Sequence, residues 1–336
     1  MYTDIHALLA VLFIVGGLVA LAWSADRFVD GAAGVARWLG ISPFIIGMVI
    51  IGFGTCAPEF FVSLFSSVSG HASLSLGNAY GSCIFNIAGI LGVSALVAPL
   101  VVRPTLSFVG GPLLSVISVV SYLVLRDGAL QYADSWLLLG LFFVLMPLYC
   151  WYDQRKKSEG DEDGTDASSS KAVANWRMAF DLVIGLAVMV GASHLLVWGS
   201  VDVARALGVS ELVIGLTIVA IGTSVPELAT AVVAARKGES ELVLGNIVGS
   251  NLFNMLCVVG TAGAASGEGI AGFSELVVSR DLPLMLLASL SVIAFGANWR
   301  RPRENGRVSR LDGAIWILAF IAYLAVTVYQ EILNNG

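Results

Sequence analysis

Long apolar runs separated by short polar segments dominate the chain. About 20 consecutive apolar residues in helical form cross the hydrocarbon core of a bilayer, so these runs predict ten membrane-spanning helices. The predicted spans are residues 5–36, 42–69, 73–98, 106–125, 134–152, 178–204, 211–235, 241–265, 281–299 and 312–331. The first and sixth are longer than one crossing requires, and we expect them to be tilted or to extend past the membrane surface.

The longest polar segment separates the fifth predicted span from the sixth. Residues 153–175 are acidic and rich in serine, a composition that predicts a disordered linker. The chain therefore divides into a first half at residues 1–152, a linker at residues 153–175 and a second half at residues 176–336. Each half contains five predicted spans.

The composition agrees with a membrane protein that crosses the bilayer many times. Hydrophobic residues make up 57% of the chain and charged residues 12%, whereas soluble domains carry about 25% charged residues. The mean hydropathy is +0.86. We expect the lipid bilayer as the surroundings, a monomer as the assembly, and no binding of nucleic acid.

The distribution of basic residues predicts the orientation, because Lys and Arg concentrate on the cytoplasmic side of membrane proteins. With ten spans, 14 of the 18 Lys and Arg residues fall on the side that holds the linker, 3 fall on the other side, and Arg27 lies within the first span. The linker is therefore expected in the cytoplasm and both termini outside. A missed span would disturb this bias.

An internal repeat links the two halves. Residues 17–92 align without a gap to residues 185–260, at a constant offset of 168, and "GFGTCAPEFF" returns as "AIGTSVPELA". The identities are concentrated in Gly, Pro, Thr, Ser, Asn and Glu. Because each half has an odd number of spans, the second half enters the membrane from the opposite side, as in secondary transporters. The predicted fold is an all-α membrane protein of ten transmembrane helices, arranged as two inverted five-helix repeats.

Two glutamates lie near the middle of the second span of each half. Glu59 follows Pro58, and Glu227 follows Pro226. An acidic side chain at this depth indicates an ion or proton path. A proline has no N–H, so each one should leave a backbone carbonyl without its helical partner one turn earlier, near Gly54 in the first half. Such carbonyls need another partner inside a membrane, and a cation would serve.

Other oxygen-bearing side chains share the glutamate face or line the next span of each half. They are Thr55, Thr223, Ser82, Asn86, Ser250 and Asn254. Calcium takes about 6–8 oxygen ligands, and two carboxylates match its charge. Sodium could use the same set. The three histidines are scattered and the four cysteines have no metal-binding spacing, so a site for zinc or copper is not expected.

Four motifs resemble a known family. "GTCAPE" and "GNAYGSCIFN" in the first half, and "GTSVPE" and "GNIVGSNLFN" in the second, resemble the paired α-repeats of the cation/calcium antiporter superfamily, in particular its prokaryotic sodium/calcium exchanger branch. The resemblance implies a carrier in the prokaryotic plasma (inner) membrane that exchanges cytoplasmic calcium for sodium or protons. It further implies no cofactor, and first and sixth helices that slide past the core.

The resemblance also implies a ligand set. Glu59 and Glu227 would be the central ligands, completed by Thr55, Thr223, Ser224, Ser82, Asn86, Ser250 and Asn254 and by backbone carbonyls near Gly52 and Ala220. Two positions depart from the family pattern: Cys56 replaces the usual serine, and Asn254 stands where well-studied exchangers carry aspartate. A thiol is a poor ligand for sodium, so we expect one flanking sodium site to be weak or absent. Asn254 removes one negative charge, which leaves both sodium and protons as candidate coupling ions.

The sequence therefore favours a calcium antiporter that uses sodium. The alternatives are a calcium/proton antiporter, with one of the glutamates carrying the proton, and a cation channel that uses the same oxygens. An enzyme is not expected, because the spans contain no Ser/His, paired-Asp or HExxH arrangement for catalysis.

Overall fold

The computed structural model describes residues 2–69, 72–160, 176–206, 220–273 and 275–335. Helices make up nearly all of this part of the chain. Within it, eight helices are long and apolar enough to cross a membrane, and a bent helix pair over residues 43–68 brings the number to nine. The predicted span 211–235 lies partly outside the described residues, and its described part is helical on both sides of a break at Ser224.

The elements of the first half follow one another closely along the chain. They are α1 (Tyr2–Leu39), α2 (Pro43–Ile46), the π-helix η1 (Gly47–Ile51), α3 (Gly52–Thr55), α4 (Ala57–Val68), α5 (Ala72–Ile84), η2 (Phe85–Leu91), α6 (Gly92–Val97), β1 (Leu100–Val102), η3 (Leu106–Gly110), α7 (Gly111–Leu125), β2 (Ala129–Gln131) and α8 (Tyr132–Gly160).

The second half has a similar order of elements. They are α9 (Trp176–Ala206), α11 (Ala220–Thr223), α12 (Val225–Arg236), α13 (Ser240–Leu252), η5 (Phe253–Val258), α14 (Val259–Ala265), β3 (Gly269–Ala271), η6 (Val277–Asp281), α15 (Leu282–Gly296), β4 (Gly306–Val308) and α16 (Arg310–Asn335).

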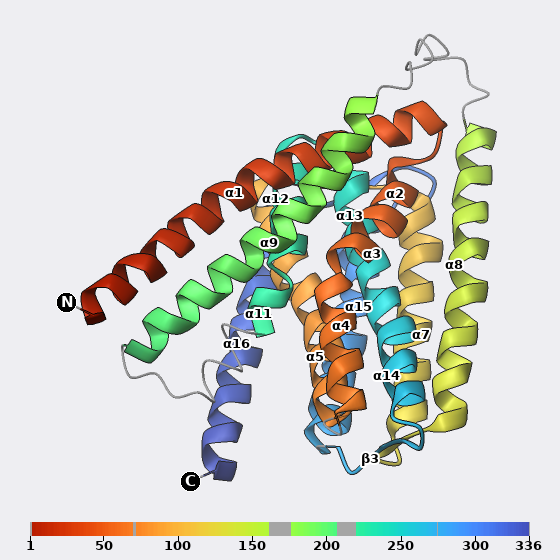
Figure 1. Cartoon of the computed structure of the whole chain (residues 1–336). Helices are drawn as coiled ribbons and strands as arrows, with labels where there is room; N and C mark the ends of the chain where they lie inside the picture. The colour runs from red at the N-terminus through yellow and green to blue at the C-terminus, as the bar shows by residue number, and fades with distance from the viewer. Residues whose placement is uncertain (1, 70–71, 161–175, 207–219, 274, 336) are drawn as a thin grey trace.

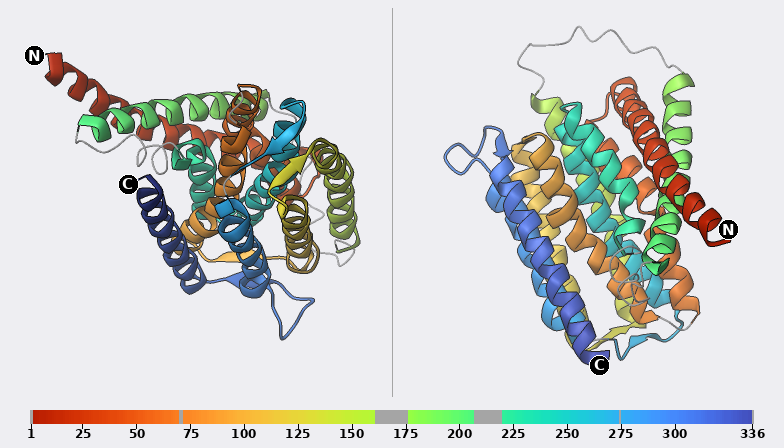
Figure 2. Two further views of the ribbon diagram at one scale, coloured as in Figure 1. Left: turned by 90° about the horizontal axis from the view of Figure 1, so that it is seen from below. Right: turned by 90° about the vertical axis from the view of Figure 1, so that its left-hand side faces the viewer.

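The long helices α1 and α9 lie side by side across one side of the bundle (Figures 1 and 2). Glycines bring them close together: a Cβ at Gly31 would lie 2.6 Å from the backbone of Leu182, and one at Gly199 would lie 2.7 Å from the backbone of Ala10. Small residues at a helix contact allow such an approach in a membrane. The prediction that the first and sixth spans are unusually long is confirmed, at 38 and 31 residues.

The centre of the bundle consists of the broken helices of the two halves. The run from α2 to α3 packs against α13, and glycines again allow the backbones to touch: a Cβ at Gly249 would collide with the backbone of Met48, and one at Gly47 would lie 2.7 Å from the carbonyl oxygen of Leu242. From their breaks, α4 and α12 extend toward opposite ends of the bundle (Figure 1). We call these the linker end, where α8 ends and α9 begins, and the β3 end.

Two short antiparallel ribbons, which the all-α prediction did not include, join the halves. Strand β1 pairs with β4, with Val101 opposite Arg307, and β2 pairs with β3, with Leu130 opposite Ile270. Each ribbon takes one strand from the first half and one from the second. The halves are therefore tied to each other through their loops as well as through helix packing.

Helix α8 is longer than the sequence predicted. It continues to Gly160, so the prediction of a disordered linker at residues 153–175 was wrong for residues 153–160, and residues 161–175 lie outside the described residues. The physical reason is a set of contacts at the helix end. The buried Asp153 carboxylate accepts a hydrogen bond from the Ser42 hydroxyl at 2.7 Å, and the Gln154 amide donates to the Gly40 carbonyl oxygen at 3.0 Å.

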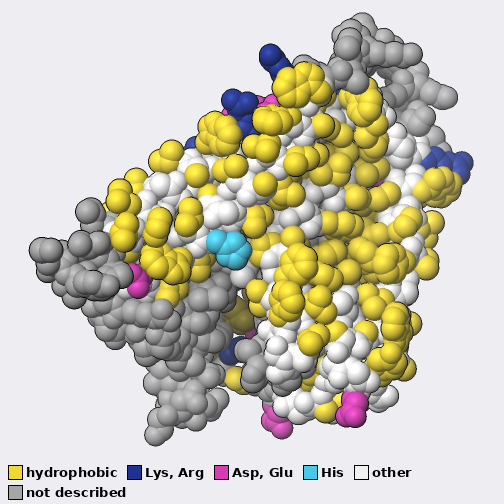
Figure 3. All heavy atoms as spheres, viewed as in Figure 1, with side chains coloured by type: hydrophobic (Ala, Val, Ile, Leu, Met, Phe, Trp, Pro, Cys, Tyr) yellow, Lys and Arg dark blue, Asp and Glu magenta, His cyan; other side chains and the backbone are white. Residues whose placement is uncertain are grey.

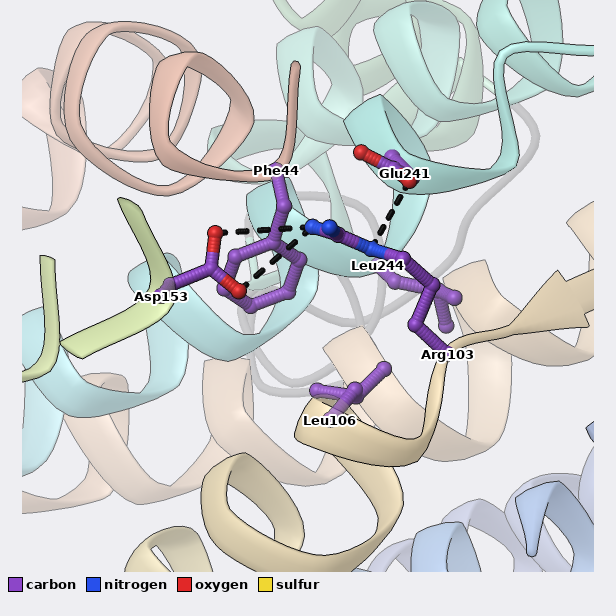
Figure 4. A pocket seen from close by; sticks show the side chains of 6 residues that line it. All are labelled: Phe44, Arg103, Leu106, Asp153, Glu241 and Leu244. Carbon is purple, nitrogen blue, oxygen red and sulfur yellow. Dashed lines mark hydrogen bonds and ion pairs between the residues drawn. The ribbon is translucent and has the colours of Figure 1, made fainter. Parts of the chain in front are cut away.

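Arg103 completes this polar cluster (Figure 4). Its guanidinium lies between Asp153 of α8, at 3.4 Å, and Glu241 of α13, at 2.8 Å. Only the Asp153 side chain is fully buried in this cluster, whereas those of Arg103 and Glu241 are partly exposed, so Arg103 chiefly compensates the buried Asp153 carboxylate. The cluster therefore fixes α8 and α13 against the loop that precedes η3.

The outer surface matches a protein embedded in lipid. In Figure 3, hydrophobic side chains cover most of the visible face, and most of the Lys and Arg side chains in view lie toward the linker end. Large apolar side chains such as Val19, Phe143 and Leu318 are at least 66% exposed. A soluble protein rarely exposes apolar patches of this extent.

Candidate functional site

Both candidate glutamates lie just after a break in a helix. Helix α3 ends at Thr55 and α4 begins at Ala57, because Cys56 between them has a ψ of 3°. Ser224, with a ψ of 15°, separates α11 from α12 in the same way. The first break bends the span by 46°. The prolines therefore stand in the first turn of a new helix, where a missing N–H is tolerated, and not in a helix interior as the sequence analysis assumed.

This arrangement places each glutamate at a helix N-terminus. Glu59 lies in the first turn of α4, and Glu227 lies in the first turn of α12. The backbone N–H groups of a first turn favour a nearby negative charge. Both side chains are buried, Glu59 at 1% exposure and Glu227 at 0%.

Glu59 is bound by a residue of the other half. The Ser224 hydroxyl donates to Glu59 Oε1 at 2.7 Å and lies 3.4 Å from the Ser82 hydroxyl. Thr223, which is partly buried, adjoins the same carboxylate. The second oxygen, Oε2, has no hydrogen-bond partner among the described residues. The structure thus brings together Glu59, Ser82 and Ser224.

The Glu227 carboxylate has fewer hydrogen-bond partners than that of Glu59. Thr55 and Cys56 adjoin its carboxylate, but neither of its oxygens has a partner within hydrogen-bond geometry among the described residues. Cys56 is the repeat counterpart of Ser224, which binds Glu59. Its thiol therefore replaces the hydroxyl that would otherwise donate to Glu227.

Thr55 and Gly52 make hydrogen bonds that stabilise the backbone just before the break at Cys56. The Thr55 hydroxyl donates to the Ile51 carbonyl oxygen at 3.0 Å. The Gly52 carbonyl oxygen accepts from the Cys56 N–H at 3.1 Å and from the Ser250 hydroxyl at 3.5 Å. Gly52 therefore lies next to Ser250 of the other half, as the ligand set required. Ala220 begins α11.

Two asparagines support the glutamates through their backbones. The Asn78 side-chain amide donates to the Glu59 carbonyl oxygen at 3.2 Å, and the Asn246 amide donates to the Glu227 carbonyl oxygen at 3.5 Å. Neither asparagine is among the site residues predicted from the sequence. The signal that could have identified them is their equivalence in the repeat, at the same offset of 168 as the glutamates.

Asn86 and Asn254 lie where their helices widen into π-helix, in η2 and η5 respectively. Short π segments in α-helices occur frequently at functional sites. Both side chains are buried. The Asn86 side chain keeps Oδ1 unpaired within the described chain, and the Asn254 side chain keeps both polar atoms unpaired there.

The donor set fits a hard cation as the substrate. Buried polar atoms almost always have a partner, yet three of the four glutamate oxygens and two asparagine oxygens have none in the described part of the protein. All of these atoms are oxygen ligands of the kind that calcium and sodium take. No group of three or more His, Cys, Asp or Glu suited to a metal is found among the described residues.

Comparison with known proteins identifies the family. The sodium/calcium exchanger protein family matches residues 9–151 and 179–329 of this chain. The chain belongs to this sodium/calcium exchanger family. The match confirms the resemblance that the four motifs indicated.

Relatives of this exchanger family cover nearly the whole chain. CaxA of Alkalimonas amylolytica is 39% identical over 94% of this chain and 98% of its own. The inner membrane protein YrbG of Escherichia coli is 37% identical over 95% of this chain and 97% of its own. A solved structure of the sodium-calcium exchanger NCX_Mj, soaked with Na+ and Sr2+, has a TM-score of 0.79 and 27% identity, covering 95% of this chain and 98% of that one. The chain is therefore a membrane antiporter of this family.

In this exchanger the two ends of the bundle differ in how they cover the glutamates. A cavity of about 580 Å³ lies between α4, α9 and α11, and Pro58, Phe65, His194 and Thr223 are among its lining residues. It lies on the α4 half, toward the β3 end, and reaches Pro58, which precedes Glu59, and Thr223, which adjoins the Glu59 carboxylate.

Helix α1 covers the other half of the site. It packs against α12, where Ala231 and Ala235 are buried. The Lys237 ammonium lies 2.7 Å from Asp26 Oδ1 and 2.8 Å from Asp30 Oδ1. Burial alone would lower the pKa of Lys237, but its hydrogen bonds to these two carboxylates raise the pKa above its usual value. An ionic contact therefore joins α1 to the end of α12 that faces the linker end.

Proposed function

We propose that this protein exchanges Ca²⁺ for Na⁺ across the membrane by alternating access at a midplane site built on Glu59 and Glu227. One observation carries the proposal: the two carboxylates are buried at equivalent helix breaks, and three of their four oxygens have no partner among the described residues. A buried unpaired carboxylate is costly, and a bound cation removes that cost. Two carboxylates neutralise one Ca²⁺.

The proposed ligand set extends beyond the glutamates. It comprises the side chains of Thr55, Thr223, Ser224, Ser82, Asn86, Ser250 and Asn254 and the backbone carbonyls near Gly52 and Ala220. In support, the Ser224 hydroxyl bridges Glu59 and Ser82, and the Ser250 hydroxyl meets the Gly52 carbonyl oxygen. Both contacts join one half of the chain to the other.

Ten spans in two inverted repeats are part of the same proposal. Three observations support the inversion: α4 and α12 extend from their breaks toward opposite ends, the repeat keeps a constant offset, and both ribbons pair a loop of one half with a loop of the other. Alternating access follows if the helix pair α1 and α9 moves relative to the core. The glycine contacts of Gly31 and Gly199 join α1 closely to α9, which supports a movement of the two helices as one unit.

The direction of access follows from the charge distribution. The excess of Lys and Arg supports a cytoplasmic linker end, with both termini outside, in a plasma (inner) membrane. The cavity beside α4 would then lead from the outside to the glutamates, and the contact of Lys237 with α1 would close the cytoplasmic path. The arrangement described above is accordingly proposed as the outward-facing one.

A flux assay tests the proposal. Proteoliposomes loaded with sodium are diluted into sodium-free medium with radioactive calcium, and parallel vesicles carry a pH gradient without sodium. Calcium uptake that follows the sodium gradient, and that Glu59→Gln and Glu227→Gln abolish, is expected. Uptake that follows only the pH gradient would indicate a calcium/proton antiporter, and single-channel conductance would indicate a channel. Either outcome refutes sodium exchange.

A further inference from the structure

Helix α5 of the first half and helix α13 of the second half meet at two side chains, a cysteine of α5 and an asparagine of α13. Asn251 of α13 and Cys83 of α5 are equivalent positions, separated by 168 residues. Both are completely buried. Asn251 Nδ2 donates to the Cys83 carbonyl oxygen at 3.4 Å, and Cys83 Sγ lies 3.8 Å from the Asn251 carbonyl oxygen. Each side chain thus donates to the backbone of the other.

The contact with Cys83 fixes which way the Asn251 amide points. A carbonyl oxygen can only accept a hydrogen bond, so the group that faces Cys83 must be the Asn251 NH₂. Asn251 Oδ1 then faces the opposite way, and Asn86 Nδ2 donates to it at 3.0 Å. Because the Asn86 NH₂ is used in this bond, its oxygen is directed away from Asn251. That oxygen is buried without a partner among the described residues.

The equivalent contact is missing on the other side of the site. Asn254 corresponds to Asn86, and its partner at the equivalent position would be the side chain of residue 83. Cys83 has a thiol, which donates weakly and accepts weakly, in place of an amide oxygen. Consistent with this, neither polar atom of the Asn254 amide has a partner in the described part of the chain. The orientation of Asn254 is therefore not fixed as that of Asn86 is.

We propose that Asn251 is a positioning residue, which locks the Asn86 amide with its oxygen toward the transported cation, and that Cys83 denies Asn254 the same support. The inference rests on the proposed cation site. It predicts that the two halves of the site are unequal, with Asn86 a preorganised oxygen ligand and Asn254 an adaptable one. Preorganised groups bind more tightly because less ordering is needed on binding.

An exchange of the two partners provides the test. Asn251→Cys removes the support from Asn86, and Cys83→Asn supplies it to Asn254. The purified full-length variants are titrated with CaCl₂ and with NaCl, and the dissociation constants are taken from the rise of the unfolding temperature with cation concentration. We expect Asn251→Cys to weaken calcium binding about threefold to tenfold, the worth of one hydrogen bond, and Cys83→Asn to strengthen it.

A double-mutant cycle separates positioning from a merely structural role. If Asn251 acts through Asn86, then Asn251→Cys has no effect on calcium affinity once Asn86→Ala is present. An equal loss with and without Asn86, or unchanged affinity in both Asn251→Cys and Cys83→Asn, overturns the inference. If Asn251→Cys does not fold, Cys83→Asn decides alone.

The outcome also distinguishes this inference from the proposed function. Wild-type protein that binds calcium but fails to exchange it for sodium refutes the sodium antiport and leaves the cycle intact. Wild-type protein that neither calcium nor sodium stabilises refutes both proposals.

Discussion

Replacing Glu227 by glutamine isolates the charge of the site from its shape. Neither Glu227 oxygen makes a protein hydrogen bond among the described residues, so Glu227→Gln removes a charge without breaking a visible contact. At 4 Å and an effective dielectric constant of 20, two unit charges attract by about 4 kcal/mol, and the divalent Ca²⁺ is attracted more strongly. Since 1.4 kcal/mol corresponds to a factor of ten in affinity, the calcium affinity should fall by at least about three orders of magnitude.

The assay combines sodium-driven calcium uptake with thermal unfolding of the purified variant. Without calcium, the variant should unfold at the wild-type temperature or above it, because no buried carboxylate remains at that position. With calcium, the wild type should be stabilised and the variant should not. The exposed Glu268 provides a matched control, since Glu268→Gln removes the same charge far from the proposed site. Calcium affinity within threefold of the wild type in Glu227→Gln would refute the two-carboxylate site.

Three further substitutions test other parts of the structure. Cys56→Ser introduces the hydroxyl that Ser224 provides at the equivalent position of the other half. Calcium uptake should persist, and the apparent affinity for sodium, measured from the sodium dependence of uptake, should rise. A lower apparent sodium affinity would contradict the reasoning. Lys237→Met removes the two ionic contacts between α12 and α1, each worth about 0.2–1 kcal/mol. Amide hydrogen exchange in α12 should therefore increase about twofold to tenfold. The control Arg236→Met should leave the exchange unchanged. Gly249→Ala would force a Cβ into the Met48 backbone and should destabilise the protein by about 1–3 kcal/mol. The control is Gly77→Ala, because Gly77 has open space around it. Equal unfolding temperatures of the two variants would argue against the close contact.

The sequence predicts the positions of the helices well because a membrane imposes a strong requirement. Apolar length decides a span, so the described helices lie close to the predicted ranges. The prediction was less accurate where a helix leaves the apolar region. The polar end of α8 resembles the segment after it in composition, and its contacts with the rest of the fold, among them those of Asp153 and Gln154, are not visible in the sequence.

The repeat also carries much of the information about the site. It singled out Glu59 and Glu227, and the structure places both at helix breaks. The location of the break was missed, because proline was taken to interrupt a helix from within. In fact Cys56 and Ser224 leave the helical conformation, and each proline belongs to the turn that follows.

What the sequence could not provide is contact across the two halves. Asn251 and Cys83 align with each other in the repeat, but only the folded structure brings them face to face and adds Asn86 to the pair. A hydrogen-bond direction depends on the full set of neighbours. The role of Asn251 therefore could not be deduced from spacing along the chain.

The two ribbons have a consequence for the order in which the protein matures. Strands β1 and β2 leave the ribosome with the first half, but their partners β4 and β3 lie in the second. Unpaired strand edges are prone to wrong associations. The first half thus waits in the bilayer with two unpaired strands, and both ribbons form only after the loops of the second half have been made.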